Sequence, residues 1–268
     1  MQASETATDH ARQAQHLATA LREAGAIALK FFRGQLRHWT KNKDSPVSEA
    51  DIAVDEFLRK HLTQPDIGWL SEESIDDRAR MASRRVFIVD PIDGTRAYIA
   101  GLPDWSICAA LVEDGRPVAA ALYAPVSDEM FVASLGAGTT RNGARVGATE
   151  GDTLNAARIA APKNYLDKLA AVNPAIAALP KIHSLALRLT RVADGTIDIA
   201  MASARSRDWD LAAADLLVHE AGGAMTNLAG GQLVYNLHDP VHAALVAAGP
   251  ARHRTMLGLV RERQIEFS

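Results

Sequence analysis

The sequence predicts a layered protein of the α/β or α+β class, because strands and helices are mixed along the whole chain. Two patterns alternate along its 268 residues. Short apolar runs rich in β-branched residues, such as 86–89, are typical of buried strands, whereas apolar residues three or four apart, as in 11–33, are typical of helices packed on a sheet. No internal repeat or long linker interrupts the alternation. We therefore expect one domain over 1–268, with two lobes at roughly 1–150 and 151–268.

The first half is expected to begin with helices and to continue mainly with strands. The helical spacing over 11–33 stops at Gly34. After a charged, irregular segment, Ser48 with Asp51 three positions later is typical of a capping box that starts a helix running to about His61. The other elements expected here are strands over 67–70, 86–89 and 129–134, a hairpin over 105–125 that turns at Asp114–Gly115, and turns over 135–146.

The second half is expected to alternate strands with helices. The clearest helix follows Asp210 and ends at Gly222–Gly223, a common C-terminal stop. The other elements expected are strands over 159–162, 196–202 and 243–249, a helix over 184–193 and a terminal helix.

Composition excludes several classes of function. The net charge of −3 gives no basic field for a nucleic-acid polymer, and no run of 18 apolar residues could span a membrane. The single cysteine, Cys108, excludes an internal disulfide, and the polar N-terminus has no secretory signal, so we expect a cytoplasmic protein. The arginines of 78–85 are expected on a solvated face, and the nine histidines at the surface.

Two aspartates, Asp90 and Asp93, follow the apolar run 86–89 in the stretch VDPIDGTRAYI. They would lie just past the carboxyl end of a strand, where α/β proteins usually bind ligands. Two unit charges ~4 Å apart repel by about 4 kcal/mol at an effective dielectric of about 20, and adding Glu72 and Asp210 would increase the repulsion. Such a group persists only if it is protonated, spread apart or neutralised by metal. Oxygen ligands without a Cys or His pattern favour Mg²⁺ or Mn²⁺ over zinc.

Each acid taken alone also has an ordinary structural explanation. Asp90 before Pro91 could form a turn, and Asp93 could cap a helix. Asp210 alone is typical of a helix N-cap, and Glu72 of a solvated surface. The individual residues therefore leave both interpretations open.

Four segments, taken together, resemble one known family. The segments SPVSEAD (45–51), WLSEES (69–74), FIVDPIDGTRAYI (87–99) and WDLAAADLLVHEAGG (209–223) are similar, in this order, to motifs of the inositol monophosphatase family. These are Mg²⁺-dependent, lithium-sensitive phosphatases that include the 3'(2'),5'-bisphosphate nucleotidases. The resemblance implies the sugar-phosphatase αβαβα sandwich, usually assembled as a homodimer.

The resemblance also implies a metal site and a catalytic group. Two or three Mg²⁺ ions, with Mn²⁺ as a substitute, would be held by the carboxylates of Glu72, Asp90, Asp93 and Asp210, the backbone carbonyl of Ile92 and, at a third and weaker position, Asp51. Thr95 would hydrogen-bond the attacking water, and either Glu72 or Asp51 would accept its proton. Two metal ions about 3.5–4 Å apart would support in-line attack by metal-activated water.

Further residues would bind the substrate. The backbone N–H groups of Gly94 and Thr95, at the start of a helix, would hold the phosphate. The segment SLALRL (184–189) is similar to one in the bisphosphate nucleotidases, and Ser203 stands where inositol-specific members have a glutamate. The substrate-binding set implied is Asp93, Gly94, Thr95, Ser184, Arg188, Ser203 and Asp210. We expect adenosine 3',5'-bisphosphate as substrate, with inositol 1-phosphate as the alternative.

Two rival functions are open at this stage. Haloacid-dehalogenase-type phosphatases also have an aspartate before Asp-Gly-Thr, but their nucleophilic acid lies two residues before the second one, whereas Asp90 lies three before Asp93. A binding protein that keeps the fold without turnover would show a broken ligand set, and every expected carboxylate is present here.

Overall fold

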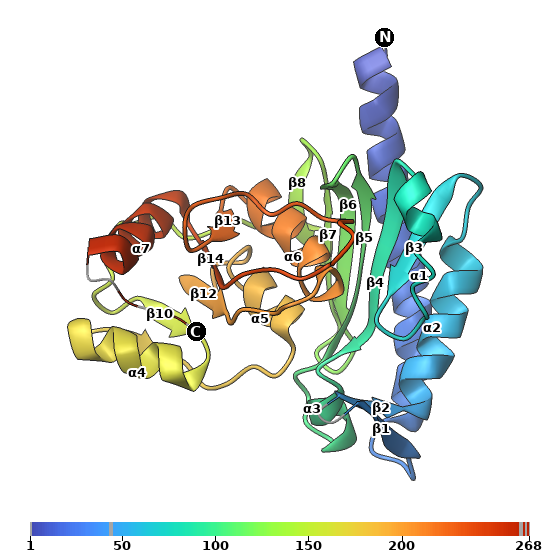
Figure 1. The fold of residues 1–268 in the computed structure, drawn as a ribbon, viewed down its shortest axis with the longest axis horizontal. Helices are drawn as coiled ribbons and strands as arrows, with labels where there is room; N and C mark the ends of the chain where they lie inside the picture. The colour runs from blue at the N-terminus through green and yellow to red at the C-terminus, as the bar shows by residue number, and fades with distance from the viewer. Residues whose placement is uncertain (1, 43–44, 263–264, 266, 268) are drawn as a thin grey trace.

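Two separate β-sheets alternate with helices in five layers (Figure 1). The computed structural model describes residues 2–42, 45–262, 265 and 267. Helices α1 and α2 cover one face of a seven-stranded sheet, and α5 and α6 lie between this sheet and a five-stranded one. Helices α4 and α7 cover the outer face of the five-stranded sheet. This arrangement confirms the expected αβαβα sandwich.

The helices and the two sheets have these bounds. The helices are α1 (Gln2–Phe31), α2 (Glu49–Leu62), α3 (Thr95–Ile99), α4 (Lys163–Val172), α5 (Leu185–Thr190), α6 (Asp208–Glu220) and α7 (Pro250–Glu262), with a 3-10 turn η1 (Ala79–Ala82). The seven-stranded sheet has the order β3 (Ile67–Ser71), β4 (Arg85–Asp93), β5 (Ser106–Glu113), β6 (Arg116–Ala124), β7 (Glu129–Ser134), β8 (Gly138–Arg141) and β9 (Ala144–Arg145). The five-stranded sheet has the order β11 (Ala177–Ala178), β10 (Arg158–Ala160), β12 (Ile199–Ala202), β14 (Leu245–Ala248) and β13 (Ala224–Asn227).

The core lies in the spaces between these layers. In β4, Ile88 packs between the two sheets and Phe87 packs against the α1–α2 layer, because successive side chains of a strand point to opposite faces. Both faces of the strand are covered, and this explains why 86–89 is apolar without alternation. Helix α6 is apolar on nearly all sides because it lies between two sheets.

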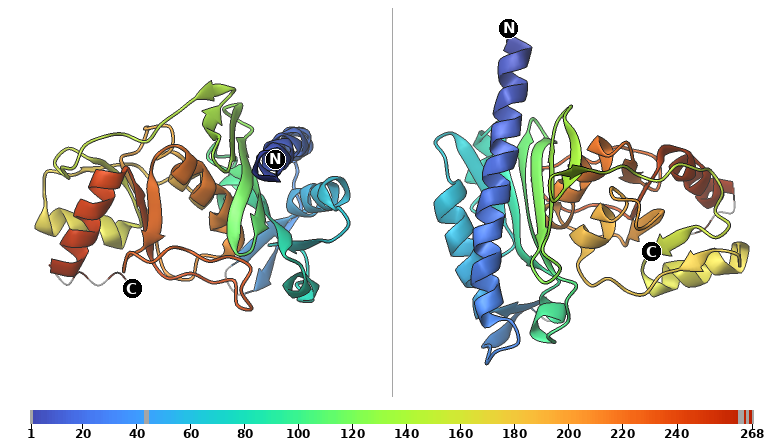
Figure 2. Two further views of the ribbon diagram at one scale, coloured as in Figure 1. Left: turned by 90° about the horizontal axis from the view of Figure 1, so that it is seen from above. Right: turned by 180° about the vertical axis from the view of Figure 1, so that it is seen from behind.

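Several expected boundaries were wrong. Helix α1 begins at Gln2 and not near residue 11, because its first turns are polar and extend past the sheet, where no apolar stripe is needed (Figure 2). The segment expected to be irregular contains a small antiparallel pair, β1 (His38–Asn42) and β2 (Ser45–Ser48), and 135–146 contains β8 and β9. Strands this short carry too few residues to show a period of two. None of the helices in the described residues is both long and apolar enough to cross a bilayer.

Two expectations about surface residues were also wrong. The side chain of Arg80 is fully buried and not on a solvated face. Its guanidinium group is satisfied by Asp76 and by acceptors in the 236–237 segment. The histidines are not all at the surface, since His10 and His253 are buried and His242 is bonded to a buried aspartate.

Candidate metal and phosphate site

A bulge in β4 brings Asp90 and Asp93 to the same side of the strand. Asp90 is opposite Cys108 of β5, and Asp93 is opposite Ser106, so three steps along β4 match two along β5. In a regular strand, residues three apart point to opposite faces, and the extra residue of a bulge cancels this change. Pro91 is tolerated there because a bulge removes one ladder hydrogen bond. The two acids therefore lie within β4, and not past its end as the sequence suggested.

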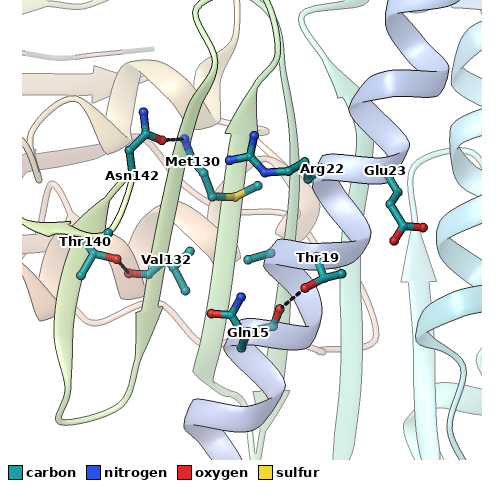
Figure 3. Close-up of a pocket in the computed structure, with 10 residues that line it drawn as sticks. Gln15, Thr19, Arg22, Glu23, Met130, Val132, Thr140 and Asn142 are labelled. Atoms are coloured by element: carbon teal, nitrogen blue, oxygen red, sulfur yellow. Dashed lines mark hydrogen bonds between the residues drawn. The ribbon is translucent and has the colours of Figure 1, made fainter.

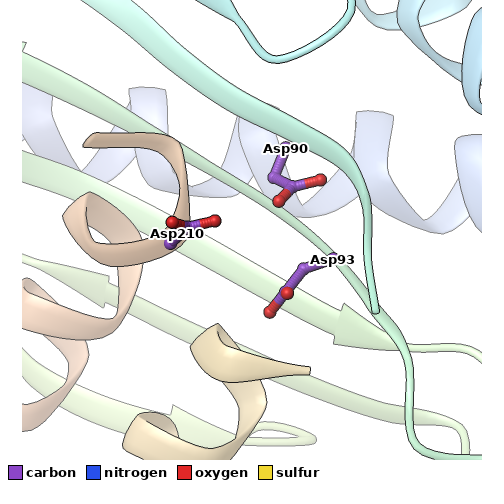
Figure 4. A group of neighbouring side chains, drawn as sticks. All are labelled: Asp90, Asp93 and Asp210. Atoms are coloured by element: carbon purple, nitrogen blue, oxygen red, sulfur yellow. The ribbon is translucent and has the colours of Figure 1, made fainter. Parts of the chain in front are cut away.

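A third carboxylate, Asp210, comes from the second half of the chain. One carboxylate oxygen from each of Asp90, Asp93 and Asp210 lies within 4.8 Å of the others (Figure 4). Helix α6 begins at Asp208, two residues earlier than expected, so Asp210 is the third residue of its first turn. There its Oδ2 accepts the backbone N–H of Arg207 at 2.6 Å. The start of α6 thus directs Asp210 toward the acids of β4.

The three carboxylates carry more negative charge than the described cations around them offset. Burial, and then the nearby carboxylates of Glu72 and Asp93, raises the pKa of Asp90 well above its usual range. Burial, and then Asp93, does the same to the pKa of Asp210. Among the described residues, the positive charges of Arg188 and Arg207 lower the pKa values of Asp93 and Asp210 only in part, and neither arginine forms a direct ion pair with them. A donor set made only of oxygens, with Asp90 and Asp93 buried, Asp210 half-buried and negative charge in excess, fits a hard divalent cation.

Hydrogen bonds from the start of α5 hold the carboxylate of Asp93 in place. Its Oδ2 accepts hydrogen bonds from the hydroxyl of Ser184 and the backbone N–H of Ala186, both at 2.6 Å. Burial raises the pKa of Asp93, although these bonds act in the opposite direction. Ser184 is fully buried and also lies 2.9 Å from the hydroxyl of Ser106. The structure therefore places Ser184 behind Asp93, and not at a surface that a substrate could reach.

Asp51 and Thr95 form a second polar pair beside the carboxylates. The hydroxyl of Thr95 lies 3.2 Å from Asp51 Oδ1 and 3.0 Å from the carbonyl oxygen of Ile92, and its one proton is donated to one of them at a time. Asp51 also accepts the backbone N–H of Ser48 at 2.8 Å, as the expected capping box requires. Burial raises the pKa of Asp51. The pair can therefore orient a polar group placed next to Thr95.

A pocket of about 290 Å³ opens above these groups. Its lining residues are Pro46, Glu72, Asp90, Ile92, Asp93, Gly94, Thr95, Arg96, Lys181, His183 and Asp210. Glu72 lines this pocket but does not belong to the close group of three carboxylates. Four residues of the implied set do not line it, namely Asp51, Ser184, Arg188 and Ser203. Of these, Asp51 and Ser184 lie behind lining residues, Arg188 is partly buried, and Ser203 is exposed outside the pocket.

The sequence did not identify three basic residues of the lining, Arg96, Lys181 and His183. Their only signal was proximity to motif residues, since Arg96 follows Thr95, and the other two lie just before Ser184. Asp104 holds their segment in place, because its Oδ2 accepts the backbone N–H of His183 at 2.6 Å and lies 2.7 Å from Nδ1 of the same ring. The segment that presents Lys181 to the pocket is therefore anchored.

Gly94 occupies a turn that other residues could not form easily. Its φ of 95° lies in the left-handed region, and a Cβ there would approach the backbone nitrogen of Ser184 to 3.2 Å. The chain can therefore turn from β4 into α3 close beside the start of α5. This turn places Thr95 next to the carboxylates.

A larger hollow lies elsewhere, between α1 and the strands β7 and β8 (Figure 3). Its volume is about 420 Å³, and among the described residues that line it only Glu23 is acidic. The one cation drawn there, Arg22, is paired with Asp128 at 2.9 Å. Size therefore does not identify the functional site, whereas the unpaired carboxylates do.

The chain as a whole is similar to proteins of one family. The sequence profile of the inositol monophosphatase family matches residues 8–264. An inositol-1-monophosphatase of Rhizobium meliloti is 33% identical, with 82% of this chain and 84% of that protein covered. A 3'(2'),5'-bisphosphate nucleotidase CysQ of Aggregatibacter actinomycetemcomitans is 31% identical (81% and 85% covered), and a histidinol-phosphatase of Mycobacterium tuberculosis is 32% identical (80% and 86% covered).

The fold is similar as well. The crystal structure of the extragenic suppressor protein SuhB from Bartonella henselae superposes with a TM-score of 0.82 at 27% identity, covering 92% of this chain and 98% of that chain. The family profile spans nearly the whole chain, and the acids of its motifs converge on one pocket. The chain therefore belongs to the inositol monophosphatase family and is a phosphatase, a hydrolase of phosphoric monoesters.

Proposed function

We propose that this protein is a Mg²⁺-dependent phosphatase whose substrate is a small bisphosphate. The first candidate is adenosine 3',5'-bisphosphate. The observation that carries the proposal is the convergence of Asp90, Asp93 and Asp210 at one pocket, with no direct ion pair to a lysine or arginine among the described residues. The family profile favours this chemistry over the haloacid-dehalogenase alternative.

The carboxylates of Glu72, Asp90, Asp93 and Asp210 and the carbonyl of Ile92 would hold two Mg²⁺ ions, or Mn²⁺ in their place, because all of these residues line the pocket. Asp51 would support a third, weaker ion from behind Thr95. When bound, the metal supplies positive charge to the phosphoryl oxygens and makes a nearby water more acidic.

The other steps depend on the protein's own groups. The Thr95 hydroxyl can accept a hydrogen bond from water while it donates to Asp51 or Ile92, and this fixes the direction from which the water approaches. Asp51, whose pKa is raised by burial, or Glu72 would accept the proton. The backbone N–H groups of Gly94 and Thr95 would hold the phosphate in line with the water.

The cationic side of the pocket supports a substrate with a second anionic group. Lys181 is exposed, lines the pocket, and has no hydrogen bond or ion pair among the described residues. Arg96 and His183 line the same pocket. Lys181 is therefore better placed than Arg188 to meet a second phosphate. Inositol 1-phosphate and histidinol phosphate remain alternatives, because relatives with both names match at similar identity.

Phosphate release from four compounds tests the proposal. Adenosine 3',5'-bisphosphate, inositol 1-phosphate, histidinol phosphate and fructose 1,6-bisphosphate are compared with Mg²⁺, with Mn²⁺ and with EDTA. We expect metal-dependent release, with the highest kcat/KM for the adenosine bisphosphate. Release that persists in EDTA would contradict the metal chemistry, whereas preference for a monophosphate would contradict only the substrate.

Three further properties are proposed from family membership. They are inhibition by millimolar Li⁺, a homodimeric state and a cytoplasmic location. A lithium titration of the Mg²⁺-dependent activity and sedimentation of the purified protein test the first two directly.

A further inference from the structure

The segment between β13 and β14, residues 228–244, links the two sheets. It leaves the five-stranded sheet and reaches the seven-stranded one (Figure 1). There the backbone N–H of Tyr235 donates to the carbonyl of Gly115 at 3.0 Å, and Arg116 donates to the carbonyl of Leu233 at 2.8 Å. We name residues 228–244 the crossover segment.

The crossover segment holds the first turn of α6. Asp208, the first residue of this helix, is almost fully buried. Its Oδ2 accepts the backbone N–H of Asn236 at 2.7 Å, and its Oδ1 lies 2.7 Å from Nε2 of His242. A carboxylate only accepts, so Nε2 carries the proton. The backbone N–H of Asp208 donates to the carbonyl of Pro240 at 3.1 Å.

The same segment is bound to the chain that follows Glu72. The buried guanidinium group of Arg80 donates to Asn236 Oδ1 at 2.6 Å and to the carbonyl of Leu237 at 3.1 Å. The Nη2 atom of the same group donates to Asp76 Oδ2 at 2.8 Å. One set of hydrogen bonds therefore runs from Asp76 and Arg80, through the crossover segment, to the helix turn that carries Asp210.

We propose that His242 and Asp208, supported by Asn236 and Arg80, are positioning residues that hold Asp210 at the metal site. The inference rests on the proposed function, since it takes Asp210 as a metal ligand. Asp90 and Asp93 belong to a sheet strand, whereas Asp210 belongs to a helix, and like charges push the two groups apart when no cation is present. The crossover segment opposes this separation. Residues that orient metal ligands commonly change metal affinity by 10–100-fold when removed.

A matched pair of variants tests the proposal. His242→Ala removes the donor to Asp208, and His253→Ala removes a buried histidine of α7, whose Nε2 lies 2.9 Å from Thr226 Oγ1. Calorimetric titration with Mg²⁺ alone, without substrate, gives the Kd of each folded protein, and thermal unfolding in EDTA gives its stability. We expect His242→Ala to raise the Kd about 10-fold. We expect His253→Ala to lower Tm without changing the Kd.

Two more variants complete the test. His242→Gln retains a side-chain donor, and we expect it to restore at least part of the affinity. Asn236→Gly keeps the left-handed backbone at φ 58° but removes the acceptor of Arg80, and it provides the test if His242→Ala does not fold. Wild-type Kd in both His242→Ala and Asn236→Gly, or an equal loss in His253→Ala, would overturn the inference alone. Absence of Mg²⁺ binding by the wild type would instead overturn the proposed function.

Discussion

Two buried groups of acids in this molecule have opposite surroundings. Asp198, beside β12, is almost fully buried, but it accepts hydrogen bonds from the side chain and backbone of Arg158 and from Thr149. Although burial alone would raise its pKa, these partners lower it to about 2. Asp90 is buried to a similar degree among other carboxylates, and its pKa is raised well above the usual range. Burial alone therefore does not identify a functional acid, whereas several buried carboxylates close together, with pKa values raised by one another, are a candidate site.

Asp93→Asn tests the group of carboxylates around Asp90 and should have the largest effect on activity. The amide oxygen can still accept from Ser184 and Ala186, but the charge that binds the cation is lost. We expect Mg²⁺-dependent phosphate release to fall at least about a hundredfold. The Tm in EDTA should stay unchanged or rise, because repulsion with Asp90 is relieved. A collapse of Tm would show that Asp93 serves packing instead.

Mg²⁺ itself should distinguish the two groups. At a concentration 100 times Kd, a ligand that binds only the native state adds about 2.7 kcal/mol to the free energy of unfolding. We expect this gain in the wild type and in Asp198→Asn, and its loss in Asp210→Asn. Denaturant unfolding with Mg²⁺ and with EDTA measures it. An undiminished gain in Asp210→Asn would place the cation elsewhere.

Lowering the pH should reduce the contribution of Asp198 to the free energy of unfolding. The pKa of Asp198 is about 2 in the folded protein against an ordinary value of 3.8, so its stabilisation is complete above the unfolded value and disappears as pH falls toward 2. A difference of this size corresponds to about 2 kcal/mol. We expect Asp198→Asn to be less stable than the wild type at pH 6 but nearly equal to it near pH 2. A constant difference across this range, measured by urea unfolding, would contradict the assignment.

Lys181→Met should have the smallest effect, because the lysine is exposed. An exposed ion pair contributes up to about 1 kcal/mol, which corresponds to about fivefold in kcat/KM. We expect that loss with adenosine 3',5'-bisphosphate and less than half of it with inositol 1-phosphate. Lys163→Met is the control, since Lys163 is an exposed lysine of α4 already paired with Asp167. Equal losses on both substrates would assign Lys181 to the scissile phosphate.

Local patterns in the sequence predicted strands and helices in layers, whereas the order of the layers and the group of acids were implied by the resemblance to the family. The continuous apolar run 86–89 indicated a strand covered on both faces, and Ser48 with Asp51 indicated the capping box that the structure contains. The bulge that turns Asp90 and Asp93 to one side could not be predicted, since it depends on the pairing of β4 with β5.

The surroundings of the motifs were harder to predict than the motifs. Arg80 and His242 looked like surface residues because their partners, at 236–237 and at Asp208, are far away in sequence. Ser184 was expected to touch substrate, whereas its place behind Asp93 depends on how α5 packs against β4. Lys181 belongs to no motif, and only the fold brings it to the pocket.

The division of the acids between a sheet strand and a helix of the other half has a consequence for kinetics. Asp210 can meet Asp90 and Asp93 only after α6 has packed against the seven-stranded sheet, so the cation has no complete set of ligands before that step. Magnesium should therefore slow unfolding and leave the rate of refolding almost unchanged. In the cell, magnesium would then determine the lifetime of the folded protein and not the rate at which a new chain folds.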